Sequence, residues 1–138
     1  MSAVLPKLVL AYYGDDFTGS TDTLEASTIA GLPTVLFLDP PTPADLGAFP
    51  EARVVGIAGV ARAKPPAWMD EHLPPIFASL RKLGAPLVQY KVCSTFDSSP
   101  RIGSIGRALD IGRRVLAPTC FTPIVVGAPA LRRYVLFA

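Results

Sequence analysis

The chain has 138 residues, half of them hydrophobic, a length and composition typical of one domain with a substantial core. Thirteen basic and eleven acidic side chains leave a net charge of +2 without a long basic run, which argues against nucleic-acid binding. No apolar stretch approaches the ~20 residues of a membrane span, and no signal peptide is recognisable, so we expect a cytoplasmic protein. Cys93 and Cys120 fit no metal-ligand spacing and are expected to stay reduced.

The chain opens with a strand pattern followed by a helix pattern. Residues 7–13 are a nearly continuous apolar run, which predicts a buried strand. The pattern becomes helical over residues 19–30, where Asp22 and Glu25 have the spacing of a capping box. Gly31 is a suitable helix stop.

The middle of the chain repeats this alternation. Residues 34–38 and 53–60 predict two more strands, separated by a proline-rich loop. Apolar residues at helical spacing over 69–83 predict an amphipathic helix. Pro74 and Pro75 lie inside it, so we expect a kink or two short helices.

The last third predicts two further strands. Residues 86–92 predict a fourth strand, and a polar loop leads into a helix over 103–116, with Ile102, Ile105, Leu109 and Leu116 on its apolar face. Residues 123–127 predict a fifth strand, and residues 128–134 the start of another helix. The alternation indicates an α/β fold: an open, mostly parallel sheet with flanking helices in a Rossmann-like, doubly wound, three-layer arrangement.

Polar side chains follow most of these strands. The carboxyl ends of parallel strands meet at one edge of the sheet, where ligands bind in open α/β folds. Expected there are Asp15, Asp16, Thr18 and Ser20, then Arg62, then Lys91, Ser94, Thr95, Asp97, Ser98 and Ser99, and finally Arg132 and Arg133. Carboxylates bind hydroxyl groups and accept their protons, while arginine and lysine bind anions. The edge therefore predicts a site for a polyhydroxy acid.

Each of these residues also has a structural interpretation. Asp15 or Asp16 is suited to cap the following helix, and Asp97 to form a turn. Arg62 is also compatible with a solvated loop. The run of small residues over 98–107 leads into a helix N-terminus whose N–H groups suit an anion.

Several catalytic motifs are missing from the chain. There is no GxxxxGK[ST] loop, and no GxGxxG follows the first strand. HExxH, CxxC and GxSxG are absent as well. A nucleotide site of these motif types is therefore excluded.

Four segments, in this order, resemble the N-terminal domain of the four-carbon acid sugar kinase family: GDDFTGSTDTLEA, GLPTVLFLD, YKVCSTFDSSPRIGSIGRALDIGRR and VVGAPALRRY. The resemblance covers nearly the whole chain. It implies a two-domain α/β kinase whose N-terminal domain binds the acid sugar and whose C-terminal domain binds ATP. The implied reaction is phosphorylation of the terminal hydroxyl of erythronate, threonate or 3-oxo-tetronate. Mg²⁺ would arrive with ATP, and no cofactor is expected tightly bound to this chain.

The resemblance also implies site residues. Those matching the two motifs are Asp15, Asp16, Thr18 and Gly19 in the first, and Lys91, Ser94, Thr95, Asp97 and Ser98 in the second. Asp15 and Asp16 are the expected catalytic residues; we favour Asp16 as the proton acceptor, with Asp15 holding other hydroxyls, although the order can be reversed and Asp97 is a third candidate. Arg62 or Lys91 would bind the substrate carboxylate. No metal site is expected.

We expect residues 1–138 to form a single α/β domain that binds substrate without turnover, because the ATP-binding half of the family is not in this chain. That half would act in cis or in trans. Other interpretations are a non-catalytic sugar-acid-binding module, one subunit of a split enzyme, or an unrelated α/β domain whose polar strand ends are only caps. An exposed apolar face, for which residues 134–138 are a candidate, would permit a homodimer.

Overall fold

A computed structural model describes residues 8–117 and 121–135. Its elements, in chain order, are β1 (Leu10–Gly14), α1 (Phe17–Ile29), β2 (Thr34–Phe37), α2 (Pro43–Gly47), β3 (Val54–Ala58), a 3₁₀ turn (Ala61–Ala63), α3 (Pro66–Lys82), β4 (Leu87–Lys91), α4 (Ile105–Leu116) and a second 3₁₀ turn (Pro129–Leu131). The four strands form one parallel sheet in the order β2-β3-β1-β4. This confirms the predicted α/β class and the first four strands.

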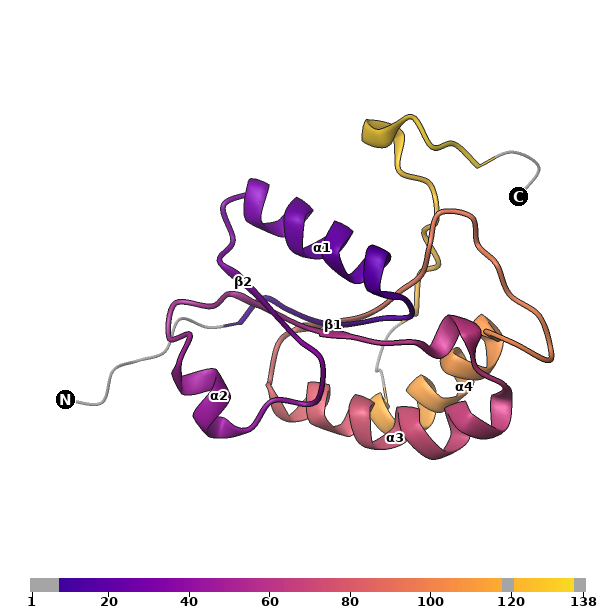
Figure 1. The fold of residues 1–138 in the computed structure, drawn as a ribbon, viewed down its shortest axis with the longest axis horizontal. Helices are drawn as coiled ribbons and strands as arrows, with labels where there is room; N and C mark the ends of the chain where they lie inside the picture. Colours follow the sequence, from indigo (N-terminus) through magenta and orange to yellow (C-terminus); the bar gives the residue numbers. More distant parts are fainter. Residues whose placement is uncertain (1–7, 118–120, 136–138) are drawn as a thin grey trace.

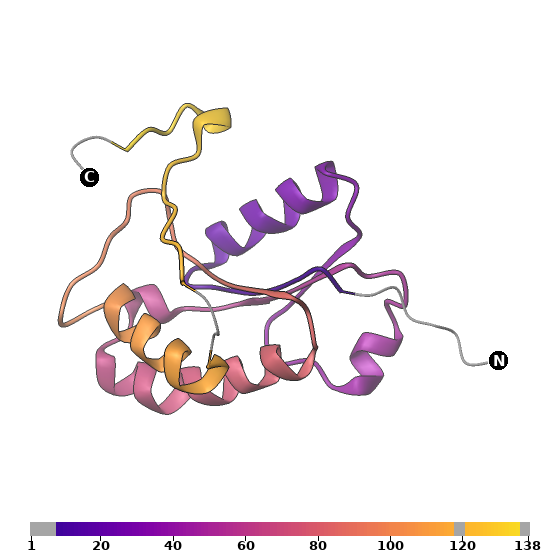
Figure 2. The ribbon, with the colours of Figure 1, turned by 180° about the vertical axis from the view of Figure 1, so that it is seen from behind.

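The connections between the strands place helices on both faces of the sheet. The chain leaves β1, passes over β3 and reaches β2, and later leaves β3, passes over β1 and reaches β4. Right-handed crossovers that run in opposite directions put their helices on opposite faces. Accordingly α1 covers one face, and α2, α3 and α4 lie on the other (Figure 1; from behind in Figure 2).

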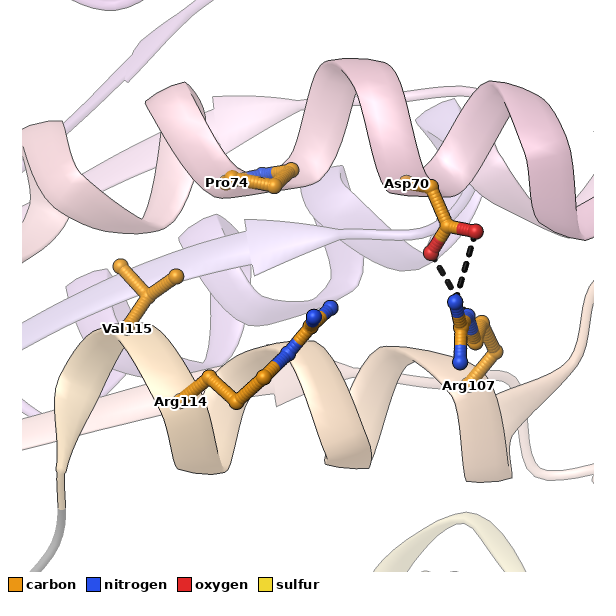
Figure 3. A pocket seen from close by; sticks show the side chains of 5 residues that line it. All are labelled: Asp70, Pro74, Arg107, Arg114 and Val115. Carbon is orange, nitrogen blue, oxygen red and sulfur yellow. Dashed lines mark hydrogen bonds and ion pairs between the residues drawn. The ribbon is translucent and has the colours of Figure 1, made fainter.

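On this face of the sheet α4 packs along α3 (Figure 3). Arg107 of α4 donates from Nε and Nη2 to the two carboxylate oxygens of Asp70 on α3, at 2.6 and 2.7 Å. Near the other end of the pair, Arg81 Nη1 donates to the Val115 carbonyl at 3.0 Å. Polar contacts thus align two helices that also share the core.

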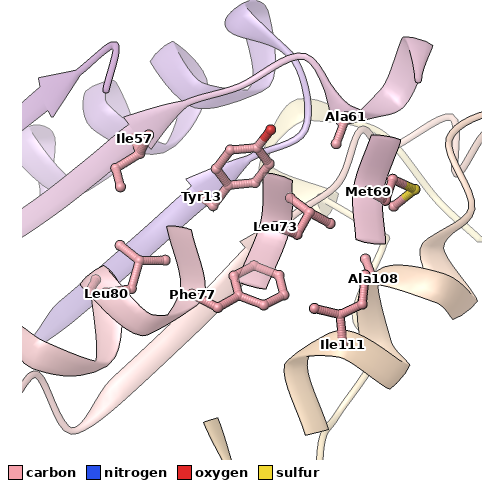
Figure 4. Close-up of a cluster of buried hydrophobic side chains, with 10 residues drawn as sticks. Tyr13, Ile57, Ala61, Met69, Leu73, Phe77, Leu80, Ala108 and Ile111 are labelled. Carbon is pink, nitrogen blue, oxygen red and sulfur yellow. The ribbon is translucent and has the colours of Figure 1, made fainter. Parts of the chain in front are cut away.

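The main core lies between the sheet and α3 (Figure 4). Met69, Leu73, Phe77 and Leu80 of α3 are all buried, which confirms the predicted amphipathic face. They pack with Ala11, Tyr13 and Ile57 of the sheet, Ala61 after β3, and Ala108 and Ile111 of α4. Burial of each large apolar side chain contributes roughly 1.5–3 kcal/mol, so this layer fixes how β1 and β3 sit against α3.

Three helix expectations need correction. Pro74 and Pro75 do not divide α3, which runs unbroken from Pro66 to Lys82. The carbonyls that lose their donors belong to Asp70 and Glu71, which are exposed, so water can pair with them. On α4 the fully buried positions are Ala108 and Ile111; of the predicted set, Leu116 packs against the core, whereas Ile102 is exposed and precedes the helix. The short α2 helix lies in the proline-rich loop, where none was predicted.

The predicted fifth strand and last helix are wrong. Residues 121–127 have no regular structure, and only the 3₁₀ turn follows them. A strand needs a neighbour for its N–H and C=O groups, and this segment does not pair with β4. Tyr134 and Val135 are exposed, whereas residue 7, Cys120 and residues 136–138 lie outside the described residues. In the part of the chain that the structure describes, no helix is long and apolar enough to cross a membrane.

Candidate functional site

A pocket of about 350 Å³ opens at the carboxyl ends of β1 and β3. These neighbouring strands send their helices to opposite faces, which makes the crevice between them the topological switch point of the sheet. The lining residues are Asp15, Asp16, Phe17, Gly59, Val60, Arg62 and Ala63. Three of the predicted site residues therefore share one pocket.

Asp15 lines this pocket but is buried, with 2% of its surface exposed. Its backbone is fixed on both sides: its N–H donates to the Lys91 carbonyl and its carbonyl accepts from the Arg62 N–H, each at 3.0 Å. Its side-chain Oδ1 has no hydrogen-bond partner among the described residues. Burial, and next the neighbouring Asp16 charge, raise the pKa of Asp15 to about 6, although Arg62 and Lys91 oppose the rise.

Asp16 caps α1. Its Oδ1 accepts a hydrogen bond from the Gly19 N–H at 2.9 Å, and its carbonyl accepts from the Ser20 N–H and hydroxyl at 3.0 and 2.6 Å. The helix therefore begins at Phe17, and the predicted capping box further along is wrong: Asp16 supplies the cap three residues before the predicted start. Its other oxygen, Oδ2, accepts from Arg62 Nη1 at 3.4 Å.

Gly19 leaves room for two charged groups. A Cβ at this position would clash with Asp16 Oδ1 and lie 3.2 Å from Lys91 Nζ. The Lys91 ammonium donates to the Val92 carbonyl at 2.7 Å. Thr18 is exposed on the first turn of α1 and does not line the pocket. The structure thus brings Gly19 and Lys91 to the site's edge and leaves Thr18 outside the pocket.

Arg62 connects the pocket to the loop after β4. Its Nη2 donates to Thr95 Oγ1 at 3.0 Å and to Asp97 Oδ2, while the Thr95 hydroxyl also donates to Asp97 Oδ2 at 2.8 Å. These hydrogen bonds hold the pKa of Asp97 below its usual value. The bond from Thr95 contributes most, followed by the bond from Arg62. One guanidinium therefore joins carboxylates from two separate motifs.

The serines of the predicted site have structural partners. Ser94 Oγ accepts from Arg133 Nη1 at 3.1 Å, and Ser98 Oγ accepts from the Ile105 N–H at 3.0 Å. Ser104 caps α4 by accepting from the Arg107 N–H at 3.1 Å. Two of the N–H groups at the start of α4 are therefore already bound to serine side chains, and the anion site expected there stays a prediction.

Gly103 closes the loop against the pocket. Its N–H donates to the Lys64 carbonyl at 2.9 Å, and its φ of +62° lies in the left-handed region that glycine favours. A Cβ here would also collide with the carbonyl of Arg62. The loop from β4 thus returns to the backbone of the residue that contacts both Asp16 and Asp97.

Residues not predicted also shape the site. Phe17, Gly59, Val60 and Ala63 line the pocket, and the Val60 N–H donates to the Tyr13 hydroxyl at 3.3 Å. A Cβ at Gly59 would overlap the Tyr13 ring. The only signal for these residues was their place directly after predicted strands, which does not say which of them face the crevice.

The described residues contain no group of three or more His, Cys, Asp or Glu side chains that could hold a metal ion. In the strand-end pocket, the two carboxylates lie beside the cation of Arg62, and no third acidic side chain lines the pocket. The donor set of these residues therefore does not fit a metal bound by protein alone.

A second hollow, of about 460 Å³, lies between α3 and α4 and is lined by Asp70, Pro74, Arg107, Arg114 and Val115 (Figure 3). It is larger, but its carboxylate is already paired with Arg107 through two hydrogen bonds. It also lies on the outer helical layer, away from the strand ends. The switch-point pocket is therefore the better candidate for a site.

Comparisons with known proteins identify the family of this chain. A family model described as the sugar-binding N-terminal domain matches residues 10–138. The chain is 62% identical over 130 residues to the 3-oxo-isoapionate kinase of Paraburkholderia graminis and 35% identical over 118 residues to the 3-oxo-tetronate kinase of Escherichia coli. These alignments cover 94% and 85% of this chain but only 27% and 28% of the relatives. The chain therefore spans about a quarter of their length.

A solved structure also resembles this fold. A crystal structure from Salmonella typhimurium LT2, provisionally named a tRNA synthase, matches with a TM-score of 0.68 and 31% identity over 80% of this chain and 26% of that one. Its name differs from those of the sequence relatives. A sequence relative from the same strain, 34% identical over 131 residues, is named a 3-oxo-tetronate kinase.

Proposed function

Because the chain belongs to the family of sugar-binding N-terminal domains, we propose that it is the substrate-binding part of an ATP-dependent kinase for four-carbon acid sugars. The match over residues 10–138 and the kinase names of the relatives confirm the resemblance expected from the two motifs. The reaction proposed is transfer of a phosphoryl group from ATP to the terminal hydroxyl of the acid sugar.

One observation carries the proposal: a guanidinium and two carboxylates converge on one pocket at the switch point. The planar fork of Arg62 suits a substrate carboxylate, and the carboxylates of Asp15 and Asp16 suit hydroxyl groups. A volume of about 350 Å³ lies within the usual range for small-molecule sites. The site therefore matches a short acid that carries hydroxyl groups.

The substrate carboxylate must share Arg62 with groups of the protein. Thr95 and Asp97 engage Nη2, and Asp16 engages Nη1 from 3.4 Å. Lys91 lies beside Gly19 at the edge of the pocket and adds a second positive charge. We assign the acid group to Arg62, with Lys91 contributing long-range attraction, and a hydroxyl group to Asp15, whose Oδ1 has no partner among the described residues.

Relatives narrow the choice of substrate to test first. The relative with 62% identity is named for 3-oxo-isoapionate, and the more distant ones for 3-oxo-tetronate. We propose a short 3-oxo sugar acid for this chain, with 3-oxo-isoapionate as the first candidate. ATP and its Mg²⁺ would be held by the remainder of the kinase, supplied in cis or in trans. Phosphoryl transfer then depends on positioning and on charge neutralisation.

The test is calorimetric titration of the 138-residue chain with 3-oxo-isoapionate, 3-oxo-tetronate, erythronate and threonate, each with and without Mg-ATP. Binding of an acid sugar that is insensitive to Mg-ATP supports a substrate domain. Absence of binding to all four acids contradicts the proposal. Binding without turnover in the complete protein would instead favour a sugar-acid-binding module.

A further inference from the structure

We propose that Asp15, and not Asp16, accepts the proton of the hydroxyl that becomes phosphorylated, and that Asp16 is a positioning residue for Arg62. The inference rests on the proposed kinase function and assigns the roles within its pocket. It reverses the order that the sequence motif alone favoured. The reason lies in how the fold uses the two adjacent carboxylates.

Both carboxylate oxygens of Asp16 already accept hydrogen bonds within the folded protein. Oδ1 accepts from the Gly19 N–H at 2.9 Å and so holds the start of α1. Oδ2 accepts from Arg62 Nη1 at 3.4 Å. A carboxylate that caps a helix through one oxygen and pairs with a guanidinium through the other has less hydrogen-bonding capacity left for a substrate hydroxyl.

Asp15 has the opposite surroundings. Among the described residues, its Oδ1 is the only buried side-chain nitrogen or oxygen atom of a non-exposed residue that lacks a hydrogen-bond partner. Leaving a buried acceptor unpaired destabilises the fold, and this cost indicates a functional role. Because its N–H and carbonyl bond to Lys91 and Arg62, the residue is held at the pocket wall. A substrate hydroxyl in the pocket would supply the missing donor.

The charges around Asp15 fit a proton acceptor. Asp16 on α1 disfavours its anion, whereas Arg62 after β3 and Lys91 on β4 favour it. The Tyr13 and Tyr90 phenols also face it, and their pKa values are raised mainly by burial, so they stay neutral and add no charge. The balance leaves the pKa of Asp15 at about 6, near enough to neutrality for both proton uptake and release.

The proposed step is an in-line phosphoryl transfer to the terminal hydroxyl of the acid sugar. The O–H bond of the terminal hydroxyl breaks and its proton goes to an Asp15 oxygen. The hydroxyl oxygen forms a bond to the γ-phosphorus of a nucleoside triphosphate, and the bond from that phosphorus to the β–γ bridging oxygen breaks. The electron pair leaves with the nucleoside diphosphate. Asp15 returns its proton to solvent when the phosphorylated acid departs.

The first experiment needs binding alone. The 138-residue chain is titrated with 3-oxo-tetronate and with its analogue lacking the terminal hydroxyl, as wild type, Asp15→Asn and Asp16→Asn. We expect wild type and Asp16→Asn to prefer the hydroxylated ligand by roughly tenfold, the value of one hydrogen bond to a charged group, and Asp15→Asn to lose most of that preference. Equal preference in Asp15→Asn and wild type overturns the inference.

The second experiment measures turnover in the complete kinase. Asp15→Asn should lower kcat by about 10²–10⁴-fold with little change in KM, and should remove the rise of kcat/KM through pH 6. Asp16→Asn should raise KM and keep that rise. The inference fails if Asp15→Asn keeps kcat within tenfold of wild type or if Asp16→Asn alone loses the pH dependence. Wild-type protein that binds no acid sugar would instead contradict the proposed function itself.

Discussion

Two arginine–aspartate clusters of this chain differ in how completely their groups are paired. On the outer layer, Arg107 and Asp70 make two hydrogen bonds at 2.6 and 2.7 Å, and each side chain satisfies the other. At the strand ends, the guanidinium of Arg62 is divided among Asp16, Thr95 and Asp97. Behind it lies Asp15, whose Oδ1 is unpaired.

The difference separates a structural pair from a site. The bidentate pair joins two helices, and each of its charges is already matched by the other. A divided guanidinium beside an unpaired carboxylate leaves hydrogen-bonding capacity that a ligand can complete. Pocket size alone would have selected the outer groove, which is the larger of the two. Unsatisfied polar groups are therefore the better guide in this protein.

The largest effect on ligand affinity is expected from removing Arg62, the arginine of the strand-end cluster. Arg62→Ala should weaken binding of the acid sugar on the order of 100-fold, because charge-assisted bonds to the substrate carboxylate are lost. Arg107→Ala is the matched control and should leave the affinity unchanged. Titration calorimetry of both variants with the acid sugar measures the two affinities. Equal losses of affinity would show that the two clusters do not differ in ligand binding.

Neutralising one aspartate in each cluster should change stability with opposite signs. Burial raises the pKa of Asp15 from 3.8 to about 6, so stability present below pH 4 is lost as the pH rises through 6, by about 3 kcal/mol. Asp15→Asn avoids this loss and should raise the melting temperature at pH 7 more than at pH 4. Arg107 lowers the pKa of Asp70. Asp70→Asn should therefore slightly lower the melting temperature at pH 7 and have less effect near pH 3.

Thermal unfolding of both variants across this pH range provides the measurement. A lower melting temperature for Asp15→Asn at pH 7 would contradict the assignment of a buried carboxylate held at a cost to stability. Stabilisation combined with loss of function is the expected signature of a site residue.

Two glycines near the clusters provide a third test. Gly103→Ala should destabilise the chain by roughly 2 kcal/mol, since position 103 has a positive φ and its Cβ would meet the Arg62 carbonyl. Gly106→Ala, three residues away inside α4, meets only Ser104 Oγ at 3.9 Å and should stabilise the helix by up to about 1 kcal/mol. Urea unfolding of the two variants measures the difference, and a neutral Gly103→Ala would show that the loop does not constrain Arg62.

The smallest expected effect concerns Asp97. If its carboxylate competes with the substrate for Arg62, Asp97→Asn should tighten binding of the acid sugar by roughly two- to fivefold, the range for an exposed ion pair. Asp110→Asn on α4 removes the same charge elsewhere and serves as the control. Weaker binding by Asp97→Asn would show that Asp97 contacts the substrate directly.

The alternation of apolar runs and helical spacing was sufficient to predict the first four strands and the three longer helices. Those patterns are local, and burial in a parallel sheet or against it accounts for them. The strand at 123–127 was a false prediction, because an apolar run becomes a strand only when a neighbouring strand supplies hydrogen bonds. Pro74 and Pro75 predicted a break in the helix, but α3 is continuous because water can pair with the exposed carbonyls that lose their N–H donors.

The sequence by itself determined the α/β class, the family and the set of polar residues that follow the strands, because these depend on residue type and order. Only the tertiary structure decided how the two adjacent aspartates differ. The crossover directions placed β1 beside β3 and so brought Arg62 to Asp16, while the backbone partners of Asp15 held its carboxylate in the wall of the pocket. Burial and pairing depend on residues distant in the sequence, and no local pattern records them.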